Sequence, residues 1–161
     1  MRTLRRIVKE DAGETMMEFA LSASILLMTI FGIMDFARAL YVYHFASYAA
    51  QQGTRYAMVR GAHWGTTTCA STTSVACNAS SSNVKSYVQG LATNGITGSN
   101  VSVTTTWPGT TISGSTTGCS TTNSPGCLVK VKVTYSFSFV LPWLPKSALG
   151  FTGTSVAVIQ E

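Results

Sequence analysis

Acidic residues are almost absent from most of this chain. The sequence has 161 residues and six acidic side chains, and none of them lies between Phe36 and Gln160. A catalytic carboxylate pair, a carboxylate metal site and a Ser-His-Asp arrangement are therefore excluded from that stretch. The two histidines, His44 and His63, have no evident nucleophile or ligand partner near them in the sequence. We therefore expect that the protein is not an enzyme and holds no cofactor or metal.

Basic residues are more numerous, but they form no dense patch outside the N-terminus. The formal net charge is +5. Four of the eleven basic residues lie in the first nine positions, and the later lysines are scattered. Nucleic-acid binding usually requires a basic patch or stripe on one surface. We therefore expect no nucleic-acid partner.

Cysteine is also scarce, and its spacing repeats. The four cysteines enclose two loops of equal length, CASTTSVAC (69–77) and CSTTNSPGC (119–127). Metal sites usually have more closely spaced cysteine pairs or nearby histidines. Two disulfides in an oxidising compartment fit better, and the repeat favours Cys69–Cys77 with Cys119–Cys127 among three possible connectivities. Loops this short contribute about 2–3 kcal/mol each. Free thiols are the alternative.

One long apolar stretch dominates the N-terminal part. No charged residue occurs from Phe19 to Met34, and the apolar character extends back to Met16. A helical pattern runs from about Glu14 to about Arg60, which predicts a helix of about 70 Å with a membrane span over about residues 16–35. Because this length is more than twice the hydrocarbon thickness, the outer half must pack on the chain's own domain or on neighbouring copies. Its tyrosines, Tyr41, Tyr43 and Tyr48, are typical of a membrane interface.

The flanking charges predict the orientation of this helix. The basic leader, residues 1–12, favours a cytoplasmic N-terminus, so that residues 61–161 lie outside the cytoplasm. Disulfides in that domain would agree with this orientation. A secretory signal is the alternative, and it requires a small-x-small cleavage site after the apolar run. The nearest candidate, residues 37–39, lies inside the continuing helical pattern.

Three charged residues of the helix are candidate functional residues. Asp35 and Arg38 are three positions apart, so they can form an ion pair on one helix face near the outer interface. Glu18 lies at the cytoplasmic edge, where a carboxylate is costly without a partner. It could extend towards the headgroups. If the chain is instead cut after Gly13, Glu14 becomes the N-terminus, and its ammonium lies about one turn from Glu18. The two groups could then neutralise each other between subunits.

The C-terminal part predicts a small sheet domain. A short helix over 84–92, capped by Ser82 or Asn83, precedes three alternating segments at 101–107, 128–140 and 151–160. Within the second segment, alternate residues from Val129 to Phe139 are apolar. We expect an antiparallel sheet of three or four strands with one face on the outer helix, which makes the fold class α+β. The loops rich in Ser and Thr are either simply solvated or make adhesive contacts.

The N-terminal residues also carry a family resemblance. A basic leader, Gly13, four residues and then Glu18-Phe19 before an apolar helix is similar to a class III (type IV-like) prepilin signal. The following forty residues resemble the TadE-like family of tight-adherence (Tad/Flp) pilus assembly proteins. The matching positions are Glu18-Phe19-Ala20, Phe31-Gly32-Ile33, Asp35-Phe36, Arg38-Ala39, Ala49-Ala50, Gly53 and Arg55-Tyr56-Ala57.

The resemblance implies a minor pilin or pseudopilin that acts in Tad pilus assembly and surface adhesion. Its leader, residues 1–13, would be removed by a prepilin peptidase at Gly13-Glu14, and Glu18 would be the charge partner in assembly. It would be a single-pass protein of the bacterial inner membrane with a periplasmic domain, in contact with lipid, other Tad pilins and the inner-membrane assembly platform. The two cysteine loops are not a mark of the family. The alternative is an uncleaved membrane anchor whose distal domain binds a ligand or surface.

Overall fold

The computed structural model describes residues 2–62, 64, 78–93, 95–119, 123–141 and 147–160, with side chains from Gly13 onward. The chain divides into two compact units. The first contains residues 1–38 and 139–145, and the second contains residues 39–138 and 146–161. The long helix α1 contributes to both units.

Helix α1 runs over Arg2–Val59 and therefore begins earlier than the sequence predicted. The expected start was near Glu14, because Gly13 separates the basic leader from the apolar run. A single glycine in a helix costs only about 1 kcal/mol, which strong helix formers on both sides can offset. The helix ends one residue before the expected Arg60, close to Gly61.

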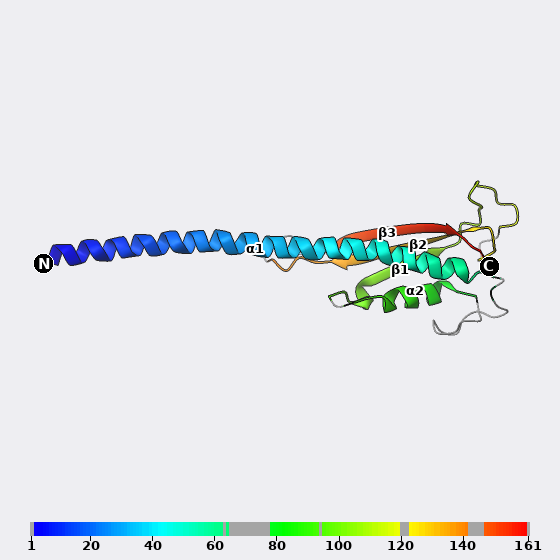
Figure 1. Ribbon diagram of the computed structural model, residues 1–161, viewed down its shortest axis with the longest axis horizontal. Coiled ribbons are helices and arrows are strands. Elements are labelled where there is room, and N and C mark those ends of the chain that lie inside the picture. Colours follow the sequence, from blue (N-terminus) through cyan, green and yellow to red (C-terminus); the bar gives the residue numbers. More distant parts are fainter. Residues whose placement is uncertain are drawn as a thin grey trace. The chain divides into compact units, whose positions relative to one another are not determined.

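The second unit contains a three-stranded antiparallel sheet in the order β1-β2-β3, shown in Figure 1. Strand β1 spans Val101–Thr106, β2 spans Leu128–Phe137 and β3 spans Leu149–Val158. The alternation predicted for β2 is confirmed, because Val129, Val131, Val133, Tyr135 and Phe137 are all buried while Lys130 and Lys132 are exposed. The prediction of β2 was three residues too long at its C-terminal end, and β3 begins two residues earlier than expected.

The short helix α2, Ser81–Gly90, is correctly predicted in type but begins earlier than expected. Its N-cap is Ser80, neither Ser82 nor Asn83. The Ser80 hydroxyl accepts a hydrogen bond from the backbone N–H of Asn83, and the Asn83 side chain accepts one from the backbone N–H of Ser80. This reciprocal capping satisfies two backbone donors at the helix start. One 3₁₀ turn, η1 (Gly98–Asn100), connects the region after α2 to β1.

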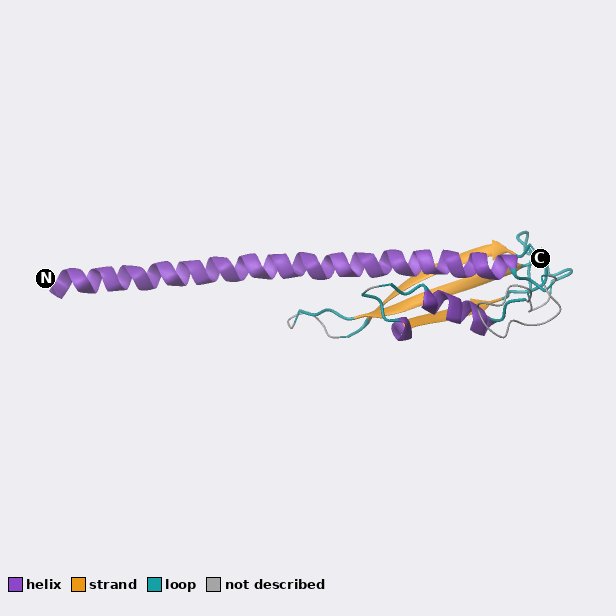
Figure 2. Ribbon diagram, turned by 60° about the horizontal axis from the view of Figure 1, so that its bottom comes forward, coloured by secondary structure: helices purple, strands orange, loops and turns teal. Residues whose placement is uncertain are grey.

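Both helices of the second unit cover the same face of the sheet, as Figure 2 shows. From Ala39 onward, α1 presents a stripe of small buried side chains, which includes Ala46, Ala49, Ala50 and Ala57. A Cβ atom added at Gly53 would lie 2.7 Å from Val88 of α2 and 3.2 Å from Val131 of β2. The outer half of the helix therefore packs on the chain's own domain. The α+β fold class predicted from the sequence is confirmed.

The closest approach of α1 to the sheet occurs at Gly153 of β3. An added Cβ atom there would lie 2.3 Å from the carbonyl oxygen of Ala46. Gly153 pairs with Val133 of β2, so it belongs to the face that the helix covers. A residue without a side chain is required at this position because the helix backbone occupies the space.

Candidate functional site

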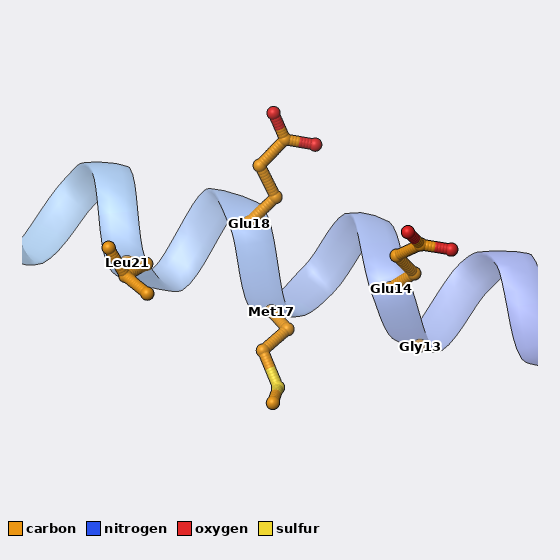
Figure 3. Close-up of a pocket in the computed structure, with 5 residues that line it drawn as sticks. All are labelled: Gly13, Glu14, Met17, Glu18 and Leu21. Carbon is orange, nitrogen blue, oxygen red and sulfur yellow. The ribbon is translucent and has the colours of Figure 1, made fainter.

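The predicted processing region lies on the surface of α1. Figure 3 shows Gly13, Glu14, Met17, Glu18 and Leu21 on consecutive turns of the helix. The Glu14 and Glu18 side chains, four residues apart, project on the same side, and Met17 projects on the other. All five residues are exposed. The carboxylates are therefore open to an external partner and are not part of an enclosed cavity.

The apolar side chains that follow are also exposed. Met16 and Phe19 retain 76% and 74% of their accessible surface, and Ile33 retains 69%. One helix in the described residues, Gly13–Val59, is long and apolar enough to cross a membrane. Exposure of so much contiguous apolar surface is unfavourable in water. This half of α1 is therefore suited to lipid or to a protein partner.

Asp35 joins α1 to the connection between β2 and β3 within the first unit. It is only 4% exposed. Its Oδ1 atom accepts a hydrogen bond from the Arg38 guanidinium at 2.8 Å. Its Oδ2 atom accepts the backbone N–H groups of Val140 at 2.9 Å and Leu141 at 3.3 Å. One carboxylate thus receives three hydrogen bonds, which compensate its removal from water.

The Asp35–Arg38 pairing matches the spacing in the sequence, whereas the contact with Val140 and Leu141 has no sequence signal. The alternating pattern of β2 continues to Val140 in the sequence, and so it predicts that the Val140 amide belongs to the sheet. Strand β2 instead ends at Phe137, and the Val140 amide donates to Asp35.

The C-terminal half of α1 places its aromatic side chains against the domain. The Tyr41 hydroxyl lies 2.7 Å from the Thr93 hydroxyl, within hydrogen-bond distance, and the Tyr43 ring meets Phe151 edge to face at 6.4 Å. These two tyrosines, predicted as interfacial aromatics, therefore also help to fix the helix on its own domain.

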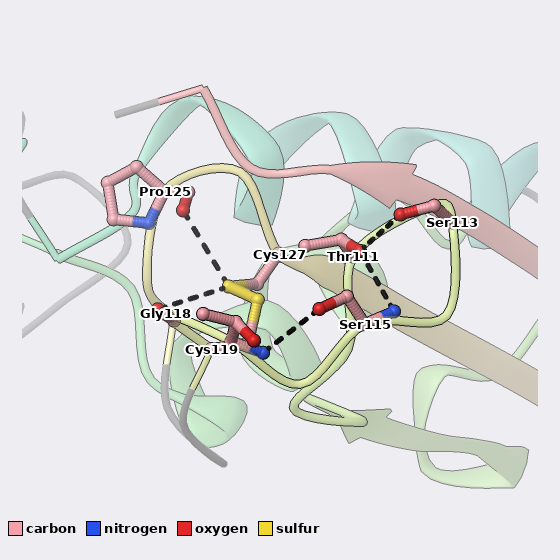
Figure 4. Close-up of a disulfide and its surroundings, with 8 residues drawn as sticks. Thr111, Ser113, Ser115, Gly118, Cys119, Pro125 and Cys127 are labelled. Atoms are coloured by element: carbon pink, nitrogen blue, oxygen red, sulfur yellow. Dashed lines mark hydrogen bonds between the residues drawn. A yellow bond between two sulfur atoms is a disulfide. The ribbon is translucent and has the colours of Figure 1, made fainter.

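A disulfide joins Cys119 to Cys127, with the Cα atoms 5.7 Å apart. It closes the loop before β2, beside a turn in which Thr111 and Ser115 bond to each other, as Figure 4 shows. The predicted pair Cys69–Cys77 lies outside the described residues. Among the residues that the structure describes, no cluster of three His, Cys, Asp or Glu side chains could hold a metal ion.

Comparison with known proteins identifies a family for part of α1. Residues 13–55 match the family model described as TadE-like protein. No curated protein and no solved structure matches the chain. The matched residues begin at Gly13, include Glu18, Asp35 and Arg38, and end within the part of α1 that packs on the sheet. The resemblance predicted from the sequence is confirmed over this range, and residues 13–55 of the chain form a TadE-like segment.

Proposed function

We propose that the chain is a minor pilin or pseudopilin of a Tad-type pilus. The observation that carries this proposal is the coincidence of two boundaries at the N-terminus. The TadE-like match begins at Gly13, the residue after which a prepilin peptidase would cut, and the apolar run of the sequence begins at Met16, shortly after it. In this proposal, the first half of α1 anchors the protein in the bacterial inner membrane, and the sheet domain lies in the periplasm.

Glu18 is the proposed charge partner in assembly. Its carboxylate is exposed and projects from the surface of α1. Cleavage after Gly13 would create an ammonium group on Glu14 about one helical turn away. In a bilayer or a helical filament, the ammonium of one subunit and the Glu18 carboxylate of the next would neutralise each other, because each is costly alone in an apolar environment.

The sheet domain is proposed to serve assembly and surface adhesion. Between β1 and β2 the chain exposes a run of hydroxyl-bearing residues, and the Cys119–Cys127 disulfide fixes its base. The Ser and Thr hydroxyls can donate and accept hydrogen bonds, so they suit contact with a polar surface. The proposed partners are the prepilin peptidase, other Tad pilins and the inner-membrane assembly platform, and the proposed role is structural.

Replacement of Glu18 tests the assembly role. We expect the Glu18→Ala variant to insert and to be processed normally, but its co-purification with other pilins should fall by about 10-fold or more. The substitution leaves the N-terminal ammonium of the neighbouring subunit unpaired, which costs more than about 1.4 kcal/mol within the membrane. Glu18→Asp should retain part of the association because it keeps the charge. The measurement is the amount of partner pilin recovered from detergent-solubilised membranes, together with the number of pili per cell.

Ser22→Ala is the matched control for this experiment. Ser22 is exposed and lies one turn further along the same side of α1. It should change neither association nor piliation. Normal piliation in Glu18→Ala, or an equal loss in Ser22→Ala, would contradict the proposed charge pairing.

A further inference from the structure

We propose that residues 139–141, which follow β2, contact the lipid headgroup region beside α1, so that the protein touches the membrane through a second segment besides its helix. The inference rests on the proposed membrane anchoring by α1. Its basis is the position of Asp35, the exposure of Val140 and the apolar side chains of residues 139–141.

Asp35 lies near the end of the lipid-facing part of α1. From Met16 to Asp35 the helix rises by about 28 Å, close to the hydrocarbon thickness of about 30 Å. Ile33, Met34 and Phe36, the residues around Asp35, are all exposed and apolar. After Ala39, α1 begins to bury its side chains against the sheet. The apolar, exposed surface therefore ends close to Asp35, which places this carboxylate at the outer interface.

The Asp35 carboxylate also holds residues 139–141 at the outer interface. The backbone N–H groups of Val140 and Leu141 both donate to Asp35, at 2.9 and 3.3 Å. Backbone polar groups near hydrocarbon cost several kcal/mol each when they lack a partner. The contact satisfies two such groups, and Arg38 balances the charge of the carboxylate. These interactions are the ones that a loop needs in order to lie at a membrane surface.

The composition of residues 139–141 fits lipid better than water. These residues are Phe139, Val140 and Leu141, so all three are apolar. Val140 is 72% exposed although it is apolar. Val140 lies beside the exposed apolar residues around Asp35, because its backbone N–H donates to that carboxylate at 2.9 Å. This continuity with the proposed lipid-facing surface favours lipid over a protein as its occupant.

Site-specific photocrosslinking in membranes tests the inference. A benzoylphenylalanine would replace Val140 in the full-length chain, expressed in its host with radiolabelled phospholipid. Two control positions use the same probe. Ile25 is 57% exposed in the centre of the proposed span, and Ile112 is 82% exposed in the loop between β1 and β2. That loop lies at the opposite end of the sheet from the β2–β3 connection.

The expected result is a phospholipid adduct at position 140 comparable with that at position 25, and several-fold above that at position 112. Lipid adducts at 25 with none at 140 would overturn the inference and leave the membrane anchor intact. Adducts at 140 exclusively with protein would also overturn it, because the patch would then be a subunit contact. Absence of lipid adducts at 25 would contradict the anchor itself, and with it both proposals.

Discussion

Asp35 accepts hydrogen bonds that its position in the sequence does not indicate. Its spacing to Arg38 predicts an ion pair, and the structure contains one at 2.8 Å. Its second oxygen accepts two backbone amides that are more than a hundred residues away along the chain. Removal of a buried acceptor leaves its donors without partners, which usually destabilises a protein more than loss of an exposed ion pair.

Substitution at Asp35 separates these two contributions. We expect Asp35→Ala to lower the free energy of unfolding by about 1–3 kcal/mol, because the amides of Val140 and Leu141 lose their acceptor. Arg38→Gln should cost less than about 1 kcal/mol, since the Arg38 side chain is 52% exposed. Thermal unfolding of the detergent-solubilised protein, followed by near-UV circular dichroism, measures both. Equal losses in the two variants would show that the ion pair, and not the backbone contact, carries the stability.

Gly153 is a second residue whose role depends on a distant element. The sequence FTGTSVAV alternates like a strand, and nothing in it indicates that the helix backbone passes directly over the glycine. Only a hydrogen atom fits at this position because α1 packs closely on β3. Ala46 and Gly153 are too far apart in the sequence for a local pattern to indicate this contact.

An alanine at position 153 tests that packing. We expect Gly153→Ala to destabilise the protein by about 1–3 kcal/mol, because its Cβ atom would overlap with the carbonyl group of Ala46 and force the helix away from the sheet. Gly150→Ala is the matched control in the same strand, where the added Cβ atom would meet Thr134 at an ordinary 3.6 Å. The two melting temperatures decide the question. A melting temperature for Gly153→Ala equal to that of the control would contradict the close approach.

The elements with strong periodicity could be predicted from sequence, and their ends could not. Two patterns are longer than a turn or loop would produce: the alternation from Val129 to Phe137 and the apolar run from Phe19 to Met34. The type of these two elements could therefore be predicted. Strand β2 ends at Phe137, and the Val140 amide then donates to Asp35, a distant residue that local alternation does not indicate. The start of α2 depends on the Ser80–Asn83 capping pair within a run of four candidate caps.

The Cys119–Cys127 disulfide gives a prediction at the level of one loop. We expect Cys119→Ser with Cys127→Ser to cost about 2–3 kcal/mol, mainly through the unfolded state. Amide hydrogen exchange should become faster in residues 107–119. The β2 amides that pair with β3 should keep the same degree of protection from exchange. Membrane insertion of α1 should not change. A global loss of the sheet, or no change in loop exchange, would contradict a local role for this disulfide.

At the scale of the whole molecule, α1 has two halves with different surfaces. Up to about Arg38 its apolar side chains are exposed, and from Ala39 onward its small side chains are buried against the sheet. The TadE-like match spans both halves. The helix therefore combines an exposed apolar half, which is suited to lipid or to a protein partner, with a packing surface for the domain. This division agrees with the proposed role as a membrane-anchored pilin-like subunit.

The most direct test of this account is the N-terminal sequence and intact mass of the membrane-purified protein, with and without the host's prepilin peptidase. We expect a mature chain that starts at Glu14 in the presence of the peptidase and at Met1 in its absence. A Gly13→Leu variant should retain its leader in both strains. A chain that starts at Met1 in both strains would contradict processing at Gly13, and the protein would then be an uncleaved anchor that carries a binding domain.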